Sequence, residues 1–150
     1  MAQELAAAAA ELVGVIIPDG EGACLGTCAV LARVFADHGI ATRVVRGTYD
    51  GHAHWWLETE ALRIDPTRWQ FASGVPLVET LADDGASDEV PYLREQVFAS
   101  PWSHEQAVAE FARMFAYHDV GLRHGQHIMA ELAGVAHARH QRPCRTSADH

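Results

Sequence analysis

The hydrophobic pattern of the chain changes its period near Gly39, and this change limits the folds that are open to it. Before Gly39, apolar residues recur at helical spacing over residues 3–16 and again from Cys24 to His38. After it, residues 41–49 are rich in Thr, Val and Tyr, which is typical of a β-strand. A chain that begins with helices and continues with strands predicts an α+β fold.

Short turn signals then predict how the strands are joined. Asp50-Gly51 is a strong signal for a two-residue hairpin, and a second strand is expected at 52–59. A turn at Glu60-Ala61 leads to a short third strand at 62–65. We therefore expect an antiparallel sheet of three or four strands, packed against the helix that has Cys24 at its N-terminus.

The second half of the chain predicts two more helices. Residues 66–100 contain several Pro and Gly residues and an acidic cluster, so we expect loops with short elements there. Ser103-His104-Glu105-Gln106 is a capping box that starts a helix to about Tyr117, and another helix is expected over 125–139. These C-terminal helices are expected to cover another face of the sheet, and about 141–150 to form a loose tail.

Length, charge and cysteine content limit the class of protein. A chain of 150 residues with 49% apolar residues predicts a single domain, 1-150, with a substantial core. The net charge of -9 argues against nucleic acid and an anionic membrane as partners. Glu11 interrupts the N-terminal apolar stretch and no basic segment precedes it, so we expect a cytoplasmic protein without a signal peptide. Three cysteines are too few for a disulfide scaffold and favour reduced thiols.

Cys24, His54 and Asp65 have the order and setting of a thiol enzyme. Cys24 opens a helix, where unpaired N–H groups and the helix dipole favour a thiolate and can bind an oxyanion. Gly22 and Gly26 are expected to let a substrate approach the backbone there. A thiol nucleophile needs a base, and the base needs a carboxylate that orients it. The pattern predicts His54 as that base and Asp65 as that carboxylate.

Cys28 and His52 are the nearest competitors for these roles. Cys28 follows one helical turn after Cys24 on the apolar face, which predicts a packing role. His52 lies beside the hairpin turn and is expected to be more exposed than His54. The alternative is a zinc site made of Cys24, Cys28, His52 and His54, because both pairs have spacings that place them on one face. In that case Asp65 would have no role as a metal ligand.

Four sequence pieces carry a resemblance to a known family. They are, in order, Cys24, Gly39-Ile40-Ala41-Thr42-Arg43-Val44-Val45-Arg46-Gly47, His54-Trp55-Trp56-Leu57-Glu58 and Asp65-Pro66-Thr67. Over residues 22–71 the chain resembles the core of the transglutaminase-like superfamily, a branch of the papain-like thiol enzymes. More weakly, it resembles the leader peptidases of lasso-peptide pathways. The register of the resemblance selects Cys24 over Cys28 and His54 over His52.

The resemblance implies cysteine-dependent acyl transfer on an amide, peptide or thioester, without a cofactor or metal. The acyl group would come from a small molecule, a peptide or a carrier, and would pass to water or to an amine. Papain-like enzymes often carry an upstream Gln as oxyanion donor, and the only one here, Gln3, is far from Cys24. Trp56 and Trp69 are the candidates for that donor. A non-catalytic binding module of the same fold is a further alternative, and the retention of all three triad residues weighs against it.

Overall fold

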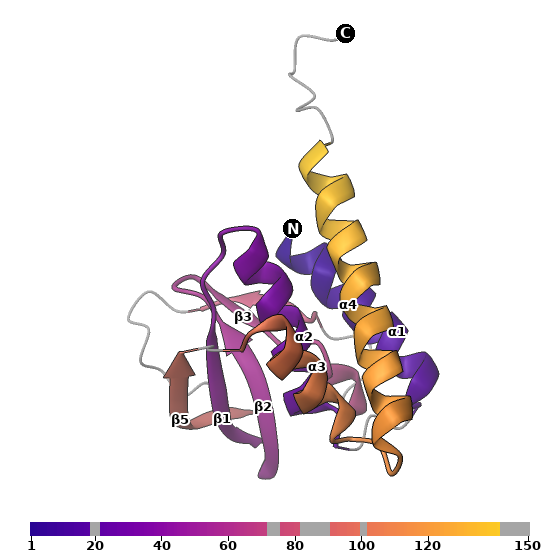
Figure 1. The fold of residues 1–150 in the computed structure, drawn as a ribbon. Helices are drawn as coiled ribbons and strands as arrows, with labels where there is room; N and C mark the ends of the chain where they lie inside the picture. The colour runs from indigo at the N-terminus through magenta and orange to yellow at the C-terminus, as the bar shows by residue number, and fades with distance from the viewer. Residues whose placement is uncertain (19–21, 72–75, 82–90, 100–101, 142–150) are drawn as a thin grey trace, which may run out of the picture.

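The computed structural model of the protein describes residues 1–18, 22–71, 76–81, 91–99 and 102–141. These residues form four α-helices and a five-stranded antiparallel sheet (Figure 1). The expected α+β fold class is therefore confirmed, and so is the presence of helices after the sheet. Residues 142–150, which make up nearly all of the expected tail, lie outside the described residues. No helix in the described ranges is long and apolar enough to cross a membrane.

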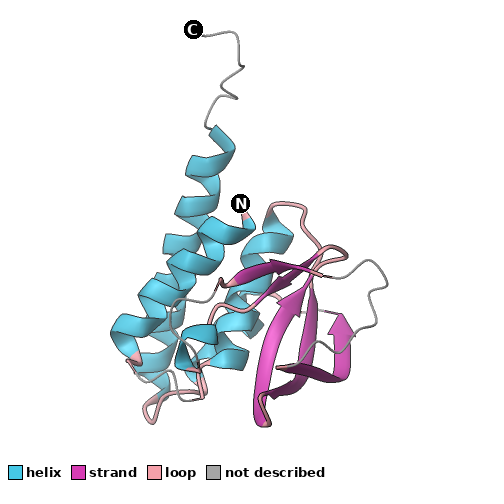
Figure 2. Ribbon diagram, turned by 180° about the vertical axis from the view of Figure 1, so that it is seen from behind, coloured by secondary structure: helices cyan, strands magenta, loops and turns pink. Residues whose placement is uncertain are grey.

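The helices lie together on one side of the sheet, as Figure 2 shows from behind. They are α1 (Ala2–Ile16), α2 (Cys24–Asp37), α3 (His104–Ala112) and α4 (His118–Gln141). The first two confirm the expected helices. Helix α2 is the central one, because it contacts β2, α1, α3 and α4.

The C-terminal helices were expected to cover another face of the sheet, and this expectation is wrong. Helices α3 and α4 pack on α2, on the same side of the sheet. The physical reason is that α2 is apolar on every side. Its residues from Gly26 to Ala32 are buried without a break, as are Val34 and Phe35. A helix of this kind needs neighbours all round it, so the sheet and three helices surround it.

The strands occur in the order β4-β3-β2-β1-β5 across the sheet. They are β1 (Arg43–Tyr49), β2 (His52–Glu58), β3 (Leu62–Ile64), β4 (Val78–Thr80) and β5 (Tyr92–Ala99). The first three confirm the expected strands, whereas β4 and β5 fall in the segment expected to hold loops with short elements. Most of the eight residues of β5 are exposed, so this edge strand lacks the alternation that identifies a strand in sequence.

The turn at Asp50-Gly51 has the backbone that its sequence predicts. Both residues have positive φ angles, 48° and 82°, as a two-residue hairpin of type I′ requires. Tyr49 and His52 face each other as the last pair of the hairpin. This turn fixes the register of β1 and β2, and therefore decides which side chains of β2 point to each face.

The two faces of the sheet carry different clusters. The face toward the helices holds the main core, to which the sheet contributes Val44, Leu57 and Ile64. The opposite face holds a smaller cluster of buried residues, with Phe71 packed against it: Val45, Tyr49, Trp56 and Tyr92. Because side chains alternate along a strand, His54 shares the second face with Trp56. The base predicted from sequence therefore lies in the aromatic cluster.

The boundary between α3 and α4 differs from the expected one. The sequence predicted helices over about 103–117 and 125–139, whereas α3 ends at Ala112 and α4 begins at His118. The capping box at Ser103 and Gln106 is confirmed, with both reciprocal hydrogen bonds present. Helix α4 starts early in spite of Gly121 and Gly125, which lower intrinsic helix propensity. Both glycines lie against α3, so close packing decides the boundary.

Gly121→Ala is expected to destabilise the protein by about 1–3 kcal/mol. A Cβ atom at Gly121 would stand 2.7 Å from the Cα and carbonyl oxygen atoms of Ala112, which are backbone atoms and cannot move aside alone. Gly134→Ala in the same helix is the matched control, because nothing lies within 4 Å of its new Cβ. That change is expected to stabilise by about 0.5–1 kcal/mol through helix propensity. Urea denaturation of both variants tests the packing, and equal effects would contradict it.

Candidate active site

The structure brings together His54 and Asp65, which are eleven residues apart in sequence. His54 lies in β2, and Asp65 follows directly after β3, the neighbouring strand. The Nε2 atom of His54 lies 2.8 Å from the Oδ2 atom of Asp65. Both side chains are almost fully buried, at 1% exposure. A buried imidazole–carboxylate pair of this geometry orients the imidazole ring and stabilises its protonated form.

Cys24 is the first residue of α2 and is half-buried. Burial by itself lowers the pKa of His54, but the hydrogen bond to Asp65 and the interaction with the Cys24 thiol raise it to about 9. The other ring nitrogen, Nδ1, is buried and has no hydrogen-bond partner of ordinary geometry among the described residues. The His54 ring therefore uses one nitrogen for Asp65 and has the other available for the thiol.

Two further donors hold the Asp65 carboxylate. The Tyr92 hydroxyl donates to Oδ2 over 2.7 Å, and the Thr67 backbone N–H donates to Oδ1 over 3.3 Å. Tyr92 could not be predicted from the sequence, because it lies in β5, far along the chain and in a segment without a recognisable strand pattern. The only sequence sign of Thr67 is its place in Asp65-Pro66-Thr67.

The first turn of α2 has features that favour an anionic ligand. Its N-cap residue is Ala23, no side chain within the described residues caps it, and its first turn holds no acidic residue. The N–H groups of that first turn therefore keep their hydrogen-bonding capacity. Gly22 has a φ angle of 76°, which favours glycine. Gly26 does not serve a substrate: a Cβ there would stand 2.9 Å from the Phe111 Cα, so this glycine lets α3 approach α2.

The two tryptophans expected as oxyanion donors differ in the hydrogen bonding of their indole nitrogens. The Trp56 indole N–H donates to Glu58 Oε2 over 3.0 Å, and the side chain is fully buried. This bond leaves no indole hydrogen for an oxyanion and corrects the expectation for Trp56. Trp69 lies in the short 3-10 helix Arg68–Gln70, and its indole nitrogen is buried without a partner in the described part of the chain. Its role as oxyanion donor stays a prediction.

Cys28 and His52 lie where the sequence analysis expected them. Cys28 is fully buried, its Sγ atom donates to the Trp55 carbonyl oxygen over 3.7 Å, and burial raises the pKa of its thiol well above the ordinary value. The His52 side chain is exposed and stacks on Phe71. Within the described ranges, no three His, Cys, Asp or Glu side chains are grouped so that they could hold a metal ion. The alternative of a zinc site therefore finds no support.

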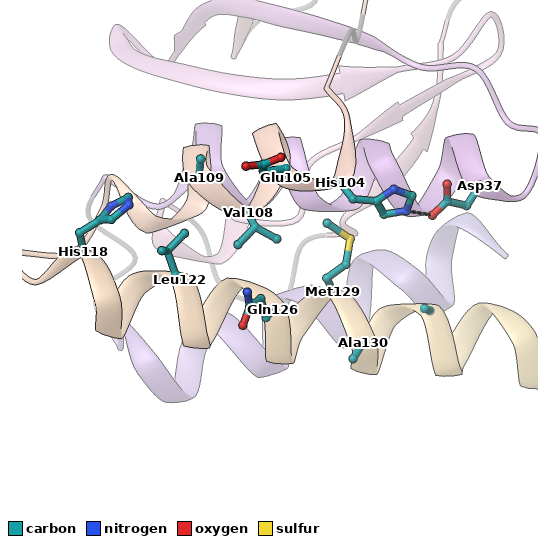
Figure 3. Close-up of a pocket in the computed structure, with 11 residues that line it drawn as sticks. Asp37, His104, Glu105, Val108, Ala109, His118, Leu122, Gln126, Met129 and Ala130 are labelled. Carbon is teal, nitrogen blue, oxygen red and sulfur yellow. Dashed lines mark hydrogen bonds and ion pairs between the residues drawn. The ribbon is translucent and has the colours of Figure 1, made fainter.

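A groove between α3 and α4 lies apart from these residues (Figure 3). Its walls are mainly aliphatic, and none of the three triad residues predicted from sequence lines it. At one end His104 Nε2 lies 2.6 Å from Asp37 Oδ2. Partial burial raises the pKa of Asp37, but the hydrogen bonds from His104 and Arg33 outweigh it and lower the pKa. This pair ties the start of α3 to the end of α2.

The raised pKa of His54 predicts how stability depends on pH. Because the folded-state pKa, about 9, exceeds the ordinary value of 6.5, the protonated ring stabilises the fold fully below about pH 6.5. This contribution is lost as pH rises toward 9, at up to about 1.4 kcal/mol per pH unit. Urea denaturation at several pH values should show the loss, and His54→Gln should remove it. His52→Gln is the control, and a loss that persists in His54→Gln would contradict the assignment.

Comparisons of the chain with protein families, with curated proteins and with solved structures gave no match.

Proposed function

We propose that the protein catalyses cysteine-dependent acyl transfer on an amide, peptide or thioester, with Cys24 as nucleophile, His54 as base and Asp65 as the orienting carboxylate. The observation that carries the proposal is the buried pair of His54 and Asp65, whose ring also interacts with the thiol at the start of α2. The sequence resemblance to the transglutaminase-like superfamily selects the same three residues. The proposal rests on both arguments together.

In the proposed reaction, each ring nitrogen of His54 has its own role. Nε2 carries hydrogen and donates it to Asp65, so Nδ1 accepts the thiol proton of Cys24. The thiolate sulfur then attacks the carbonyl carbon of the substrate and forms a tetrahedral intermediate. His54 returns the proton to the leaving amine or thiol, and the acyl group stays on sulfur as a thioester. Water or an amine, deprotonated by His54, then attacks the thioester and releases Cys24.

The backbone N–H groups in the first turn of α2 are the proposed donors to the oxyanion. They are uncapped by side chains within the described residues, and the helix dipole places partial positive charge there. The indole N–H of Trp69 is the proposed second donor. The expected substrates are small molecules, peptides or carrier-bound acyl groups. A cytoplasmic location would suit this chemistry, because thiols stay reduced there.

Acyl-enzyme formation tests the proposal. The protein is incubated near pH 7 with activated esters, thioesters and amides, with and without an added amine, and its intact mass is measured. We expect one acyl group per chain, which peptide mapping places on Cys24. Faster loss of the adduct with the amine, together with an amide product, would identify transfer; equal loss would identify hydrolysis. No adduct from any donor, with stoichiometric zinc in the purified protein, would contradict the proposal.

A further inference from the structure

We propose that Tyr92 is a positioning residue for the base: its hydroxyl fixes the Asp65 carboxylate so that one oxygen atom stays aligned with the His54 ring. This inference rests on the proposed function. The inference extends that function by adding a residue from β5 to a site that was predicted from sequence entirely within residues 22–71.

The bond between Tyr92 and Asp65 is short and buried. The hydroxyl donates to Oδ2 over 2.7 Å, and this is the same oxygen that accepts the Nε2 hydrogen of His54. Tyr92 is 1% exposed, so water does not replace the bond. Burial and the neighbouring carboxylate raise the pKa of Tyr92 above its ordinary value, which keeps the hydroxyl protonated. Tyr92 therefore acts as a donor.

The Tyr92 ring is held by charged groups from two other elements. The guanidinium carbon of Arg63 in β3 lies 4.1 Å from the ring centroid, and that of Arg68 lies 5.3 Å away. Glu79 in β4 pairs with both arginines, at 3.1 Å and 2.8 Å. Cations over an aromatic face are stabilising, more so when they are buried. This arrangement fixes the position of the ring and thereby directs its hydroxyl toward Asp65.

Aromatic neighbours hold the ring from other directions. Tyr49 and Trp56 contact it edge-on, with centroid distances of 4.9 Å and 5.0 Å. Tyr49 also faces Tyr92 in the pairing of β1 with β5. The hydroxyl of Tyr92 therefore cannot swing away from Asp65 without disturbing three strands. Rigid support of this kind holds a catalytic group in its productive geometry.

The Tyr92 hydroxyl matters because of how the Asp65 carboxylate is held. Thr67 holds Oδ1, while Tyr92 and His54 share Oδ2, so rotation of the carboxylate breaks bonds at both oxygens. Without the Tyr92 hydroxyl, Oδ2 keeps one donor among the described residues, and the carboxylate can turn away from His54. The protonated ring then loses stabilisation, so His54 becomes a weaker acceptor for the thiol proton of Cys24.

Tyr92→Phe tests the inference, with Tyr49→Phe as the matched control. Both changes remove one hydroxyl from the same aromatic cluster and keep the ring, but only Tyr92 donates to Asp65. We expect Tyr92→Phe to slow the alkylation of Cys24 by limiting iodoacetamide at pH 6 about tenfold, the equivalent of one hydrogen bond to a charged group. In ¹⁵N-histidine NMR, the His54 Nε2–H proton should move upfield and exchange faster with water. Tyr49→Phe should change neither measurement.

Unchanged alkylation and an unchanged Nε2–H signal in folded Tyr92→Phe would overturn the inference and leave the proposed function intact. If the unchanged protein shows no selective alkylation of Cys24, the proposed function fails, while the NMR comparison still decides the role of Tyr92. If Tyr92→Phe does not fold, 3-fluorotyrosine is incorporated into a Tyr49→Phe, Tyr117→Phe chain. The more acidic phenol at Tyr92 should then shift the His54 Nε2–H signal, and no shift would count against the inference.

Discussion

Replacement of Cys24 by Ala is expected to abolish acyl-enzyme formation and to lower turnover by at least about 10³-fold. The change removes the Cys24 sulfur at the start of α2. Among the described residues, this is the only sulfur that is shown to interact with the His54 ring. The fold should survive, because Cys24 is half-buried and Ala is a good helix former. The free energy of unfolding should change by less than about 1 kcal/mol. Intact mass after reaction with an activated thioester measures the first effect, and urea denaturation the second.

Cys28→Ala is the matched control for this experiment. Cys28 lies one turn further along α2, is fully buried and bonds to the carbonyl oxygen of Trp55. Its replacement should lower stability by about 1–2 kcal/mol through lost packing, yet leave the acyl adduct in place. If Cys28→Ala rather than Cys24→Ala removes the adduct, the nucleophile is wrongly assigned. If neither does, the adduct forms outside the proposed site.

The sequence predicted those elements in which the local signals, such as turn residues, agree with the pattern of buried side chains. Helix α2 and the β1–β2 hairpin are examples, because Asp50-Gly51 demands positive φ angles and the flanking residues alternate between two buried faces. The placement of His54 on one face of β2 followed from that alternation. The placement of Asp65 beside it followed from the adjacency of short antiparallel strands. These inferences needed only local pattern and chain connection.

Other features depend on contacts that leave no local pattern. Strand β5 is an exposed edge strand, so its pairing with β1 is fixed by the sheet rather than by its own periodicity. Tyr92 and its bond to Asp65 were therefore missed. Trp56 was expected to donate to an oxyanion. The face of β2 that carries it could be predicted from sequence, but the position of the Glu58 carboxylate, which accepts its indole hydrogen, could not. Gly26 was assigned to a substrate because α3 had not been placed.

Asp65→Asn is expected to lower turnover by about 10⁴-fold. An amide offers one acceptor and one donor where the carboxylate accepts from three groups: His54, Tyr92 and Thr67. If the amide oxygen takes the Oδ2 position, its NH₂ group faces the Thr67 N–H. In the reverse orientation the NH₂ group faces His54, which then places its hydrogen on Nδ1. That tautomer cannot accept the proton of Cys24, so the rate falls.

The same change should destabilise the fold by about 1–3 kcal/mol, because each orientation leaves a buried donor without an acceptor. Glu58→Gln separates this cost from the catalytic effect. Glu58 is a second buried carboxylate on the same face of the sheet, where it accepts from Trp56 and pairs with Arg94 at 3.2 Å. Its replacement should also lower stability but leave turnover near that of the unchanged protein. Equal rate losses in the two variants would mean that the carboxylates support the fold alone, and Asp65 would then have no part in orienting the base.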